Sequence, residues 1–237
     1  QIAKALCVGM APTATMPAIP IKAVHAYFDA LRVPQPVYDP AKRGFSQLCE
    51  ALELAPQFEA ARAALALAAV RSWFSAPSAV EDELWHARAR LAVCRALDEV
   101  PHLPQTHLAA GVFAAQLGDY VQAARSLARA LQLSPACAEA QVYLGQLECE
   151  AGDADQGVRR IEFAHSLDPL LSAGHDYLAR YEALRGHHDR CDERLQRFES
   201  LVGKDHFVLN LWRARFASWR GDLEPAAALH ARGGDHG

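Results

Sequence analysis

The chain has 237 residues, of which 51% are hydrophobic, so it can bury the core of one large domain or two small ones. Its formal net charge of −4 excludes the basic excess of nucleic-acid-binding and membrane-surface proteins. No apolar run reaches about eighteen residues, so no membrane span is predicted. The first residue is Gln1 rather than Met, from which we expect a fragment of a longer protein.

The six cysteines stand singly in alanine-rich sequence, and no two have the CxxC spacing of a zinc or redox site. They are Cys7, Cys49, Cys94, Cys137, Cys149 and Cys191. A free thiol in such surroundings behaves as a small apolar group. We therefore expect a reducing compartment and a cytoplasmic protein.

The first elements are irregular. Residues 1–23 are expected to be a helix remnant and a linker, because LCVGMAPTATMPAIP is rich in Pro, Ala and Thr. Helices are then predicted over VHAYFDALRV, AKRGFSQLCEALELAP and APQFEAARAALALAAVRSW. FSAPSAVEDE is expected to form a long turn before the helix LWHARARLAVCRALDEVP.

Three classes of residue share a period of 34: glycines of turns, prolines that end helices, and a small packing residue. They are Gly118, Gly152 and Gly186; Pro101, Pro135 and Pro169; and Ala96, Ala130 and Ala164. Such a period indicates stacked helix–turn–helix units. The residue after the turn glycine is Asp119, Asp153, His187 or Asp222, and an aspartate there is expected to cap the second helix, which the proline ends.

This pattern resembles the tetratricopeptide repeat, with Leu144-Gly145 as the LG pair of a first helix. The small residue of the second helix is Ala123, Gly157, Cys191 or Ala226, followed four positions later by Leu127, Ile161, Leu195 or, less typically, His230. His107, Gln141 and His175 replace the aromatic residues that the family often has. The resemblance implies an all-α, right-handed superhelix of about five repeats. Their expected ranges are 24–56, 57–103, 104–137, 138–171 and 172–206, with a partial unit 207–231 and a disordered tail 232–237.

In this family the first helices line a concave groove that binds protein partners. The residues matching its solvent-facing positions are Gln105, Val112, Gln116, Tyr143, Gln146, Glu150, Asp176, Tyr177, Arg180, Trp212, Arg215 and Trp219. Tyr143, Tyr177 and Trp212 hold one position in successive units, and interfaces are often anchored by aromatic residues and Arg. The alternative is that these aromatics fill the seams between repeats. The family's Lys/Asn clamp for chaperone tails is absent, with Val112, Gln146 and Arg180 at its asparagine positions.

The sequence has no GxSxG, SxxK or phosphate-binding glycine loop, so neither an enzyme nor a cofactor is predicted. His187, His188 and Cys191 have metal-ligand chemistry, to which His175 and His206 could add ligands. The other interpretation of these residues is a turn followed by a buried Cys191. A metal or small-molecule sensor is therefore a further alternative.

A weaker resemblance links the first helices to the tetratricopeptide regions of bacterial winged-helix regulators, class III adenylate cyclases and serine/threonine kinases. Together the two resemblances imply a non-catalytic module that binds a protein or peptide in its groove. It would be the regulatory or scaffold part of a larger bacterial signalling protein. The alternative from another class is a homo-oligomer, formed when the apolar end of the array stacks on a second copy.

Overall fold

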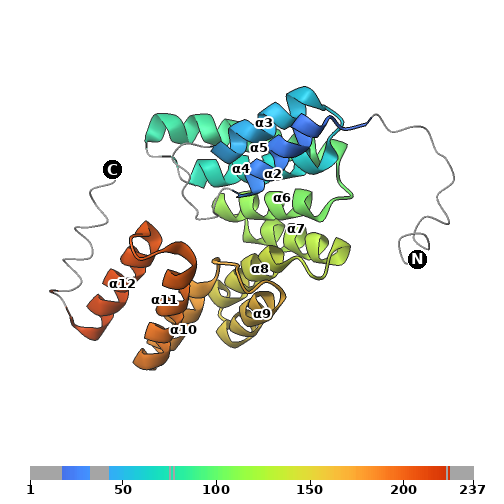
Figure 1. Ribbon diagram of the computed structural model, residues 1–237. Coiled ribbons are helices and arrows are strands. Elements are labelled where there is room, and N and C mark those ends of the chain that lie inside the picture. Colours follow the sequence, from blue (N-terminus) through green and yellow to red (C-terminus); the bar gives the residue numbers. More distant parts are fainter. Residues whose placement is uncertain (1–17, 33–42, 75, 77, 223, 225–237) are drawn as a thin grey trace, which may run out of the picture.

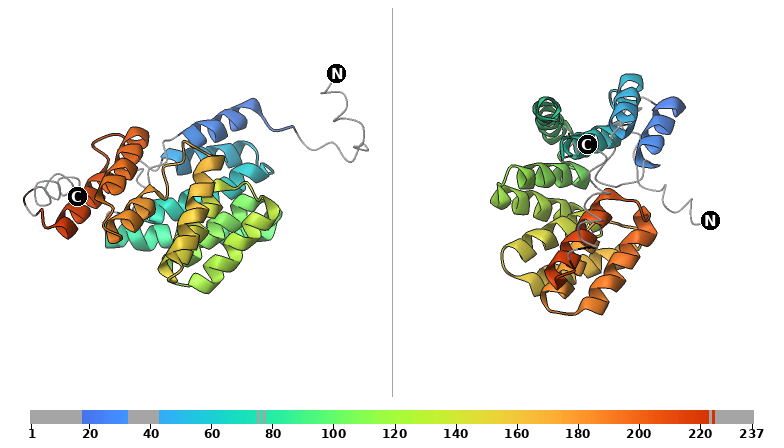
Figure 2. Two further views of the ribbon diagram at one scale, coloured as in Figure 1. Left: turned by 90° about the horizontal axis from the view of Figure 1, so that it is seen from below. Right: turned by 90° about the vertical axis from the view of Figure 1, so that its left-hand side faces the viewer.

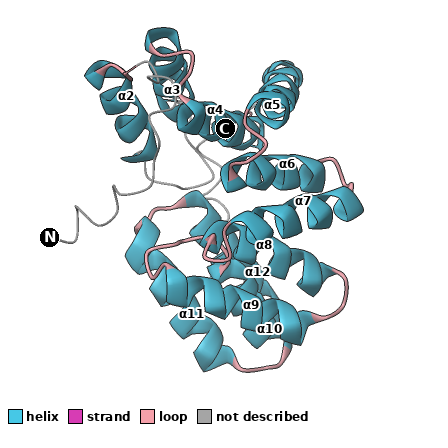
Figure 3. Cartoon of the chain, turned by 90° about the vertical axis from the view of Figure 1, so that its right-hand side faces the viewer, coloured by secondary structure: helices cyan, strands magenta, loops and turns pink. Residues whose placement is uncertain are grey.

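A computed structural model describes residues 18–32, 43–74, 76, 78–222 and 224 (Figure 1). All regular structure in these ranges is helical, as predicted, and comprises 11 helices without a strand (Figure 3). They are α2 (Ile21–Arg32), α3 (Arg43–Leu54), α4 (Glu59–Phe74), α5 (Ala79–Glu99), α6 (Pro104–Gln116), α7 (Tyr120–Leu133), α8 (Ala138–Glu150), α9 (Ala154–Leu167), α10 (His175–Leu184), α11 (His188–Val202) and α12 (Phe207–Arg220). The predicted tail 232–237 and most of 1–23 lie outside the described residues.

The helices pack as consecutive pairs, from α2 with α3 to α10 with α11, and α12 follows. Successive first helices touch one another, as α4 touches α6 and α10 touches α12, and each second helix also packs on the next first helix. The pairs wind into a helical-repeat superhelix from α2 to α12 (Figures 1 and 2). We call the surface formed by α4, α6, α8, α10 and α12 the inner face. No helix of the described part is long and apolar enough to cross a membrane.

The turn within each pair follows the predicted chemistry. Gly118 and Gly152 have positive φ angles of 78° and 98°, which residues with a Cβ rarely adopt. The next residue caps the second helix: the carboxylate of Asp119 accepts from the Gln122 amide at 3.0 Å, and that of Asp153 from Gln156 at 3.2 Å. His187 holds the same position in α11 without a side-chain cap.

The stripe of small residues on the second helices is buried, as the period implies. Ala123, Leu127 and Ala130 of α7 are all 0% exposed. A very close crossing joins α8 and α9, where a Cβ built on Gly157 would lie 2.4 Å from the carbonyl oxygen of Gly145. Only glycine fits there without a shift of the backbone, so the small residues set the distance between the paired helices.

Two of the three residues that replace the family's aromatics, His107 and Gln141, hold the turns between repeats. His107 lies 2.7 Å from the Pro101 carbonyl through Nε2, and Gln141 donates to the Pro135 carbonyl at 3.2 Å. Both bonds reach six residues back, across the turn that precedes each first helix. A polar side chain at this position therefore ties a helix to the end of the previous repeat.

Two helices begin earlier than predicted. Residues 79–83, expected in the long turn, are the first turn of α5. The Ser78 hydroxyl caps this helix by accepting from the Glu81 amide at 3.3 Å. The negative charges of Glu81 and Asp82 in the first turn interact favourably with the positive N-terminal end of the helix dipole. The prediction of a turn was wrong because acidic residues, which are common in loops, here form the first turn of a helix. Similarly, α2 begins at Ile21 rather than at Val24.

The two halves of the array are held together differently. One buried apolar cluster runs without a break from α4 to α8, whereas separate clusters serve the helices from α8 to α12. Ion pairs bridge these later junctions. They are Glu150–Arg180, Asp155–Arg185, Glu162–Arg194 and Asp192–Arg220, with N···O distances of 2.5–2.7 Å.

Candidate interaction surface

The most exposed aromatic cluster among the predicted site residues lies on α12. The guanidinium of Arg215 lies 5.1 Å from the ring centroid of Trp212 and 5.8 Å from that of Trp219. Both indoles pack on Phe216, which is 2% exposed, and Trp219 itself remains 47% exposed. Arg215 is exposed and forms no ion pair with a described residue. The cluster thus presents an indole edge and a cation held in place by stacking.

A second cluster joins α8 to α10. Arg180 donates to the Glu150 carboxylate at 2.6 Å, and its guanidinium lies 5.8 Å from the ring of Tyr177. Tyr177 also hydrogen-bonds Glu150, and burial raises its pKa above the ordinary value. Because the charges of Arg180 and Glu150 pair with each other, this cluster stabilises the junction between repeats. Part of it also faces solvent.

Tyr143 belongs to a network that links α4 and α8. Arg71 donates to Glu139 at 2.8 Å and also hydrogen-bonds Tyr143, whose ring packs against the main apolar cluster. Burial raises the pKa of Tyr143, and it raises the pKa of the neighbouring Asp176 to about 6. These contacts fit the interpretation that Tyr143 fills the seam between repeats. The carboxyl of Asp176, by contrast, titrates close to neutral pH.

The remaining candidates are scattered. Gln105 is exposed, Gln116 and Gln146 are half-buried, and none of the three pairs with another candidate. Val112 is 5% exposed within the main apolar cluster, so the prediction that it faces a ligand was wrong. It lies on the side of α6 that packs against neighbouring helices, and a short helix apolar all round gives no periodicity from which to choose the side.

Of the candidate metal ligands, His187 contacts another side chain and Cys191 is buried. His187 Nδ1 lies 2.9 Å from the Glu182 carboxylate, and Cys191 is 0% exposed, with a thiol whose pKa burial raises. A buried neutral thiol packs as an apolar group. Within the described ranges, no three His, Cys, Asp or Glu side chains are grouped to hold a metal ion.

His175 and His206 belong instead to a ladder of rings that the sequence did not reveal. His165 stacks on His175 with centroids 4.1 Å apart, and Phe198 lies between His175 and His206, at 6.2 Å and 5.8 Å. Burial lowers the pKa of all three histidines, that of His175 to about 3. These rings come from four segments of the last two repeats, so no local spacing could predict the ladder.

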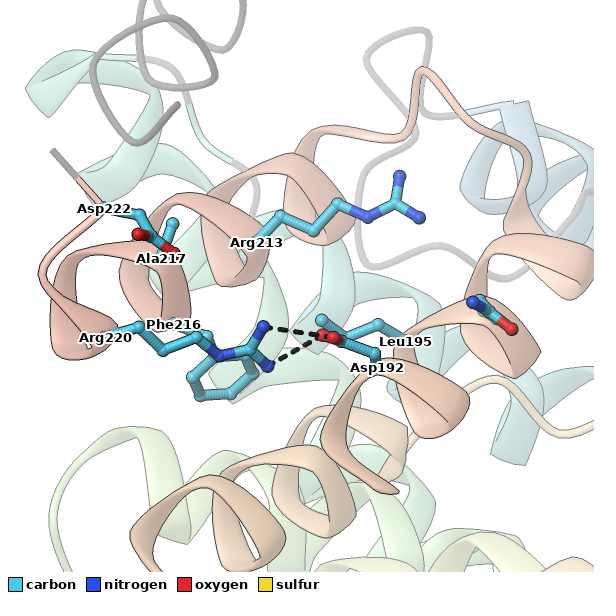
Figure 4. A pocket seen from close by; sticks show the side chains of 8 residues that line it. Asp192, Leu195, Arg213, Phe216, Ala217, Arg220 and Asp222 are labelled. Atoms are coloured by element: carbon cyan, nitrogen blue, oxygen red, sulfur yellow. Dashed lines mark hydrogen bonds and ion pairs between the residues drawn. The ribbon is translucent and has the colours of Figure 1, made fainter. Parts of the chain in front are cut away.

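A small pocket of about 230 Å³ lies between α11 and α12 (Figure 4). Its cations are already neutralised. Arg220 makes a two-point pair with Asp192, at 3.0 and 2.7 Å, and Arg213 extends away from that pair (Figure 4). Arg213 instead donates to the Glu199 carboxylate. The pocket is therefore a weak candidate for binding an anion.

Sequence reasoning missed the charged residues that the superhelix brings together. Asp155 accepts from Tyr181 at 2.6 Å and from Arg185 at 2.5 Å, and Arg185 stacks over the Tyr181 ring at 4.3 Å. The four-residue spacing of Tyr181 and Arg185 could have indicated their contact, since such residues share a helix face. No comparable signal links Arg71 to Glu139, which lie 68 residues apart.

Comparison with known proteins identifies the fold. No family model and no curated protein matches the chain. Among solved structures, TTC0263, a tetratricopeptide protein of Thermus thermophilus, matches with a TM-score of 0.60 and 16% identity, over 84% of this chain and 98% of that one. PilW, a type IV pilus biogenesis factor, matches with 0.57 and 17%, over 90% of both chains.

A third match is a chain of the APC/C hetero-tetramer Cut9–Hcn1, with a TM-score of 0.67 and 16% identity. It covers 90% of this chain but 37% of that one. Together the matches show that the chain has the tetratricopeptide-repeat fold, as its 34-residue period predicts. At these identities the likeness concerns the fold alone.

Proposed function

We propose that the chain is a non-catalytic module that binds a protein or peptide segment on its inner face, chiefly over α10 and α12. The observation that carries the proposal is the Trp212–Arg215–Trp219 cluster, which we call the anchor cluster. In it, Arg215 has no acidic partner among the described residues. Exposed Leu184 on α10, at 66%, and Leu211 on α12, at 45%, add apolar surface on the same two helices. Stacked arginines and indoles are typical anchors of protein interfaces.

Support for a scaffold role comes from the fold neighbours, which include a pilus biogenesis factor and a chain of a multi-subunit complex. In a longer bacterial signalling protein, such a module would recruit or restrain an output domain. Because α12 is the last described helix, the alternative of stacking through the apolar end of the array would involve the same helix, and a measurement of molar mass in solution distinguishes the two.

The test is selection of peptides from a random phage-displayed library on the immobilised chain, followed by measurement of their Kd values. We expect Arg215→Ala/Trp219→Ala to weaken the selected peptides at least about tenfold, since it removes two anchors. Tyr120→Ala is the matched control, because Tyr120 is 60% exposed on the second helix α7. Failure to select a peptide, or equal binding to the double variant, would contradict the proposal.

A further inference from the structure

Helix α5 has two apolar faces, although the repeat needs only one. It spans 21 residues, whereas the second helices α7, α9 and α11 span 14 or 15. Its buried face, formed by Trp85, Ala89, Val93 and Ala96, packs into the array. Its early start adds a turn and a half of helix, and this addition contributes to a second face.

The second face is an exposed stripe, formed by Val80, Leu84, Ala87, Leu91 and Cys94, which we call the α5 stripe. Val80, Leu84 and Leu91 are 80%, 46% and 57% exposed. At about 100° per residue, the stripe lies on the side of α5 opposite to the buried face. Its spacing alternates between four and three, which is the a/d pattern of a helix that packs along another helix.

No described element covers this stripe. The extensive contacts of α5 are with α4 and α6, and it lies at the edge of the array (Figure 3). Apolar residues scattered singly on a surface need no partner, but a stripe along one helix favours a second helix as its occupant. The partner must therefore present a matching apolar stripe.

The charges beside the stripe identify that partner. On one flank, Glu83 and Arg90 stand seven residues apart, both exposed and both without an ion pair to a described residue. This order of charges is complementary to itself when two copies of α5 run antiparallel, because the same flank of each helix then faces the other. In antiparallel copies, Glu83 of each helix faces Arg90 of the other.

We propose that the α5 stripe is a homodimer interface, on which α5 of a second copy packs antiparallel about a two-fold axis near Ala87. Such an interface is self-complementary, because each copy supplies the same stripe and the same order of charges. It lies on a second helix, away from the α12 anchor cluster, so dimerisation and binding on the inner face are compatible. It also differs from end-to-end stacking of the array.

The first test measures molar mass by light scattering at about 100 µM, a concentration at which modest helix-pair interfaces associate. We expect a dimer for the wild type and a monomer for Leu84→Glu and Leu91→Glu, each folded by circular dichroism. Leu170→Glu changes a 78% exposed leucine of another turn and should remain dimeric. A monomeric wild type, or a dimer that survives both stripe variants, would overturn the proposal.

The second test exchanges charges without touching the buried core. Glu83→Arg alone and Arg90→Glu alone each place like charges across the two-fold axis and should weaken the dimer. Mixing the two variants should restore association as a heterodimer, because every Arg then faces a Glu. Dimers of equal strength in the separate and mixed samples would show that these charges do not meet.

The third test determines orientation by disulfide formation in a Cys94→Ser background. Ala87→Cys lies near the two-fold axis and should cross-link to its own copy under mild oxidation. Val80→Cys lies far from its own copy in an antiparallel pair, so it should remain uncrosslinked. Cross-linking of Val80→Cys as readily as Ala87→Cys would indicate a parallel pair and overturn the geometry.

Discussion

Single residues determine how closely the paired helices approach. Gly157 of α9 and Gly145 of α8 meet through backbone atoms, while the equivalent pair in the previous repeat is Ala123 and Gly111. Small residues at one position therefore recur for a steric reason rather than for helix propensity, since glycine lowers the stability of a helix interior. The buried histidine ladder is a second feature that depends on single residues.

We expect Gly157→Ala to destabilise the chain by about 1–3 kcal/mol, because the added methyl group overpacks the crossing. The new Cβ would lie 2.4 Å from the Gly145 oxygen and 2.5 Å from the Cys149 sulfur. Arg159→Ala, an exposed change in the same helix, should alter the free energy of unfolding by less than about 0.5 kcal/mol. Urea unfolding of both variants measures the difference, and equal stabilities would contradict close packing.

The histidine ladder predicts loss of stability in mild acid. The pKa of His175 is about 3 in the folded chain, below the ordinary value of about 6.5 that it regains on unfolding. The unfolded chain therefore binds a proton that the folded chain does not, and stability falls as the pH drops from about 6.5 towards 3. Arg194 and Arg197, which also face His175, add to this effect.

The measurement is the free energy of unfolding at about pH 7.5 and about pH 5.5. His175→Phe keeps an aromatic ring but cannot titrate, so between these two pH values it should lose about 1.4 kcal/mol less stability than the wild type. His188→Gln, which removes an exposed histidine outside the ladder, should follow the wild type. The same acid sensitivity in the Phe variant would show that His175 is not responsible.

At the scale of elements, ion pairs occur in both halves of the array, including Arg62–Glu99 and Arg71–Glu139 in the first half, but in the second half they bridge separate apolar clusters. The main apolar cluster joins α4 to α8, and Arg180, Arg194 and Arg220 bridge the later helices. Exposed ion pairs weaken in salt, whereas apolar contacts do not. The helices α10 to α12, which also carry the proposed anchor cluster, should therefore open more readily.

We expect raising NaCl from about 0.05 M to about 1 M to increase amide hydrogen exchange in α10–α12 about two- to tenfold more than in α4–α8. Mass spectrometry of the exchanged peptides measures both regions in one sample. Arg194→Gln at low salt should reproduce part of the increase. A uniform response along the chain would contradict the division.

Much of this arrangement could be predicted from the sequence, because a 34-residue period constrains every repeat at once. The caps at Asp119 and Asp153 and the buried stripe of α7 follow from local spacing. The prediction that Val112 faces a ligand was wrong because an apolar, alanine-rich helix gives no local signal of its exposed side. The predicted start of α5 was wrong because acidic residues are common both in loops and at helix starts. Contacts such as Arg71–Glu139 depend on the superhelical twist, which the period does not determine.

At the scale of the whole molecule, the fold separates two surfaces. The inner face carries the anchor cluster on α12, and the edge of the array carries the α5 stripe. A scaffold with this division could hold a partner segment while paired with a second copy. In the proposed complex, the partner segment binds over α10 and α12.

The most direct test of that claim is the NMR spectrum of the four tryptophan indoles on addition of a selected peptide. We predict that the Trp212 and Trp219 signals shift. Those of Trp85, which is 5% exposed, and Trp73, whose Nε1 donates to Asp82 at 3.0 Å, should stay in place. A bound peptide that leaves Trp212 and Trp219 unmoved, or that shifts Trp73 and Trp85 instead, would contradict the account.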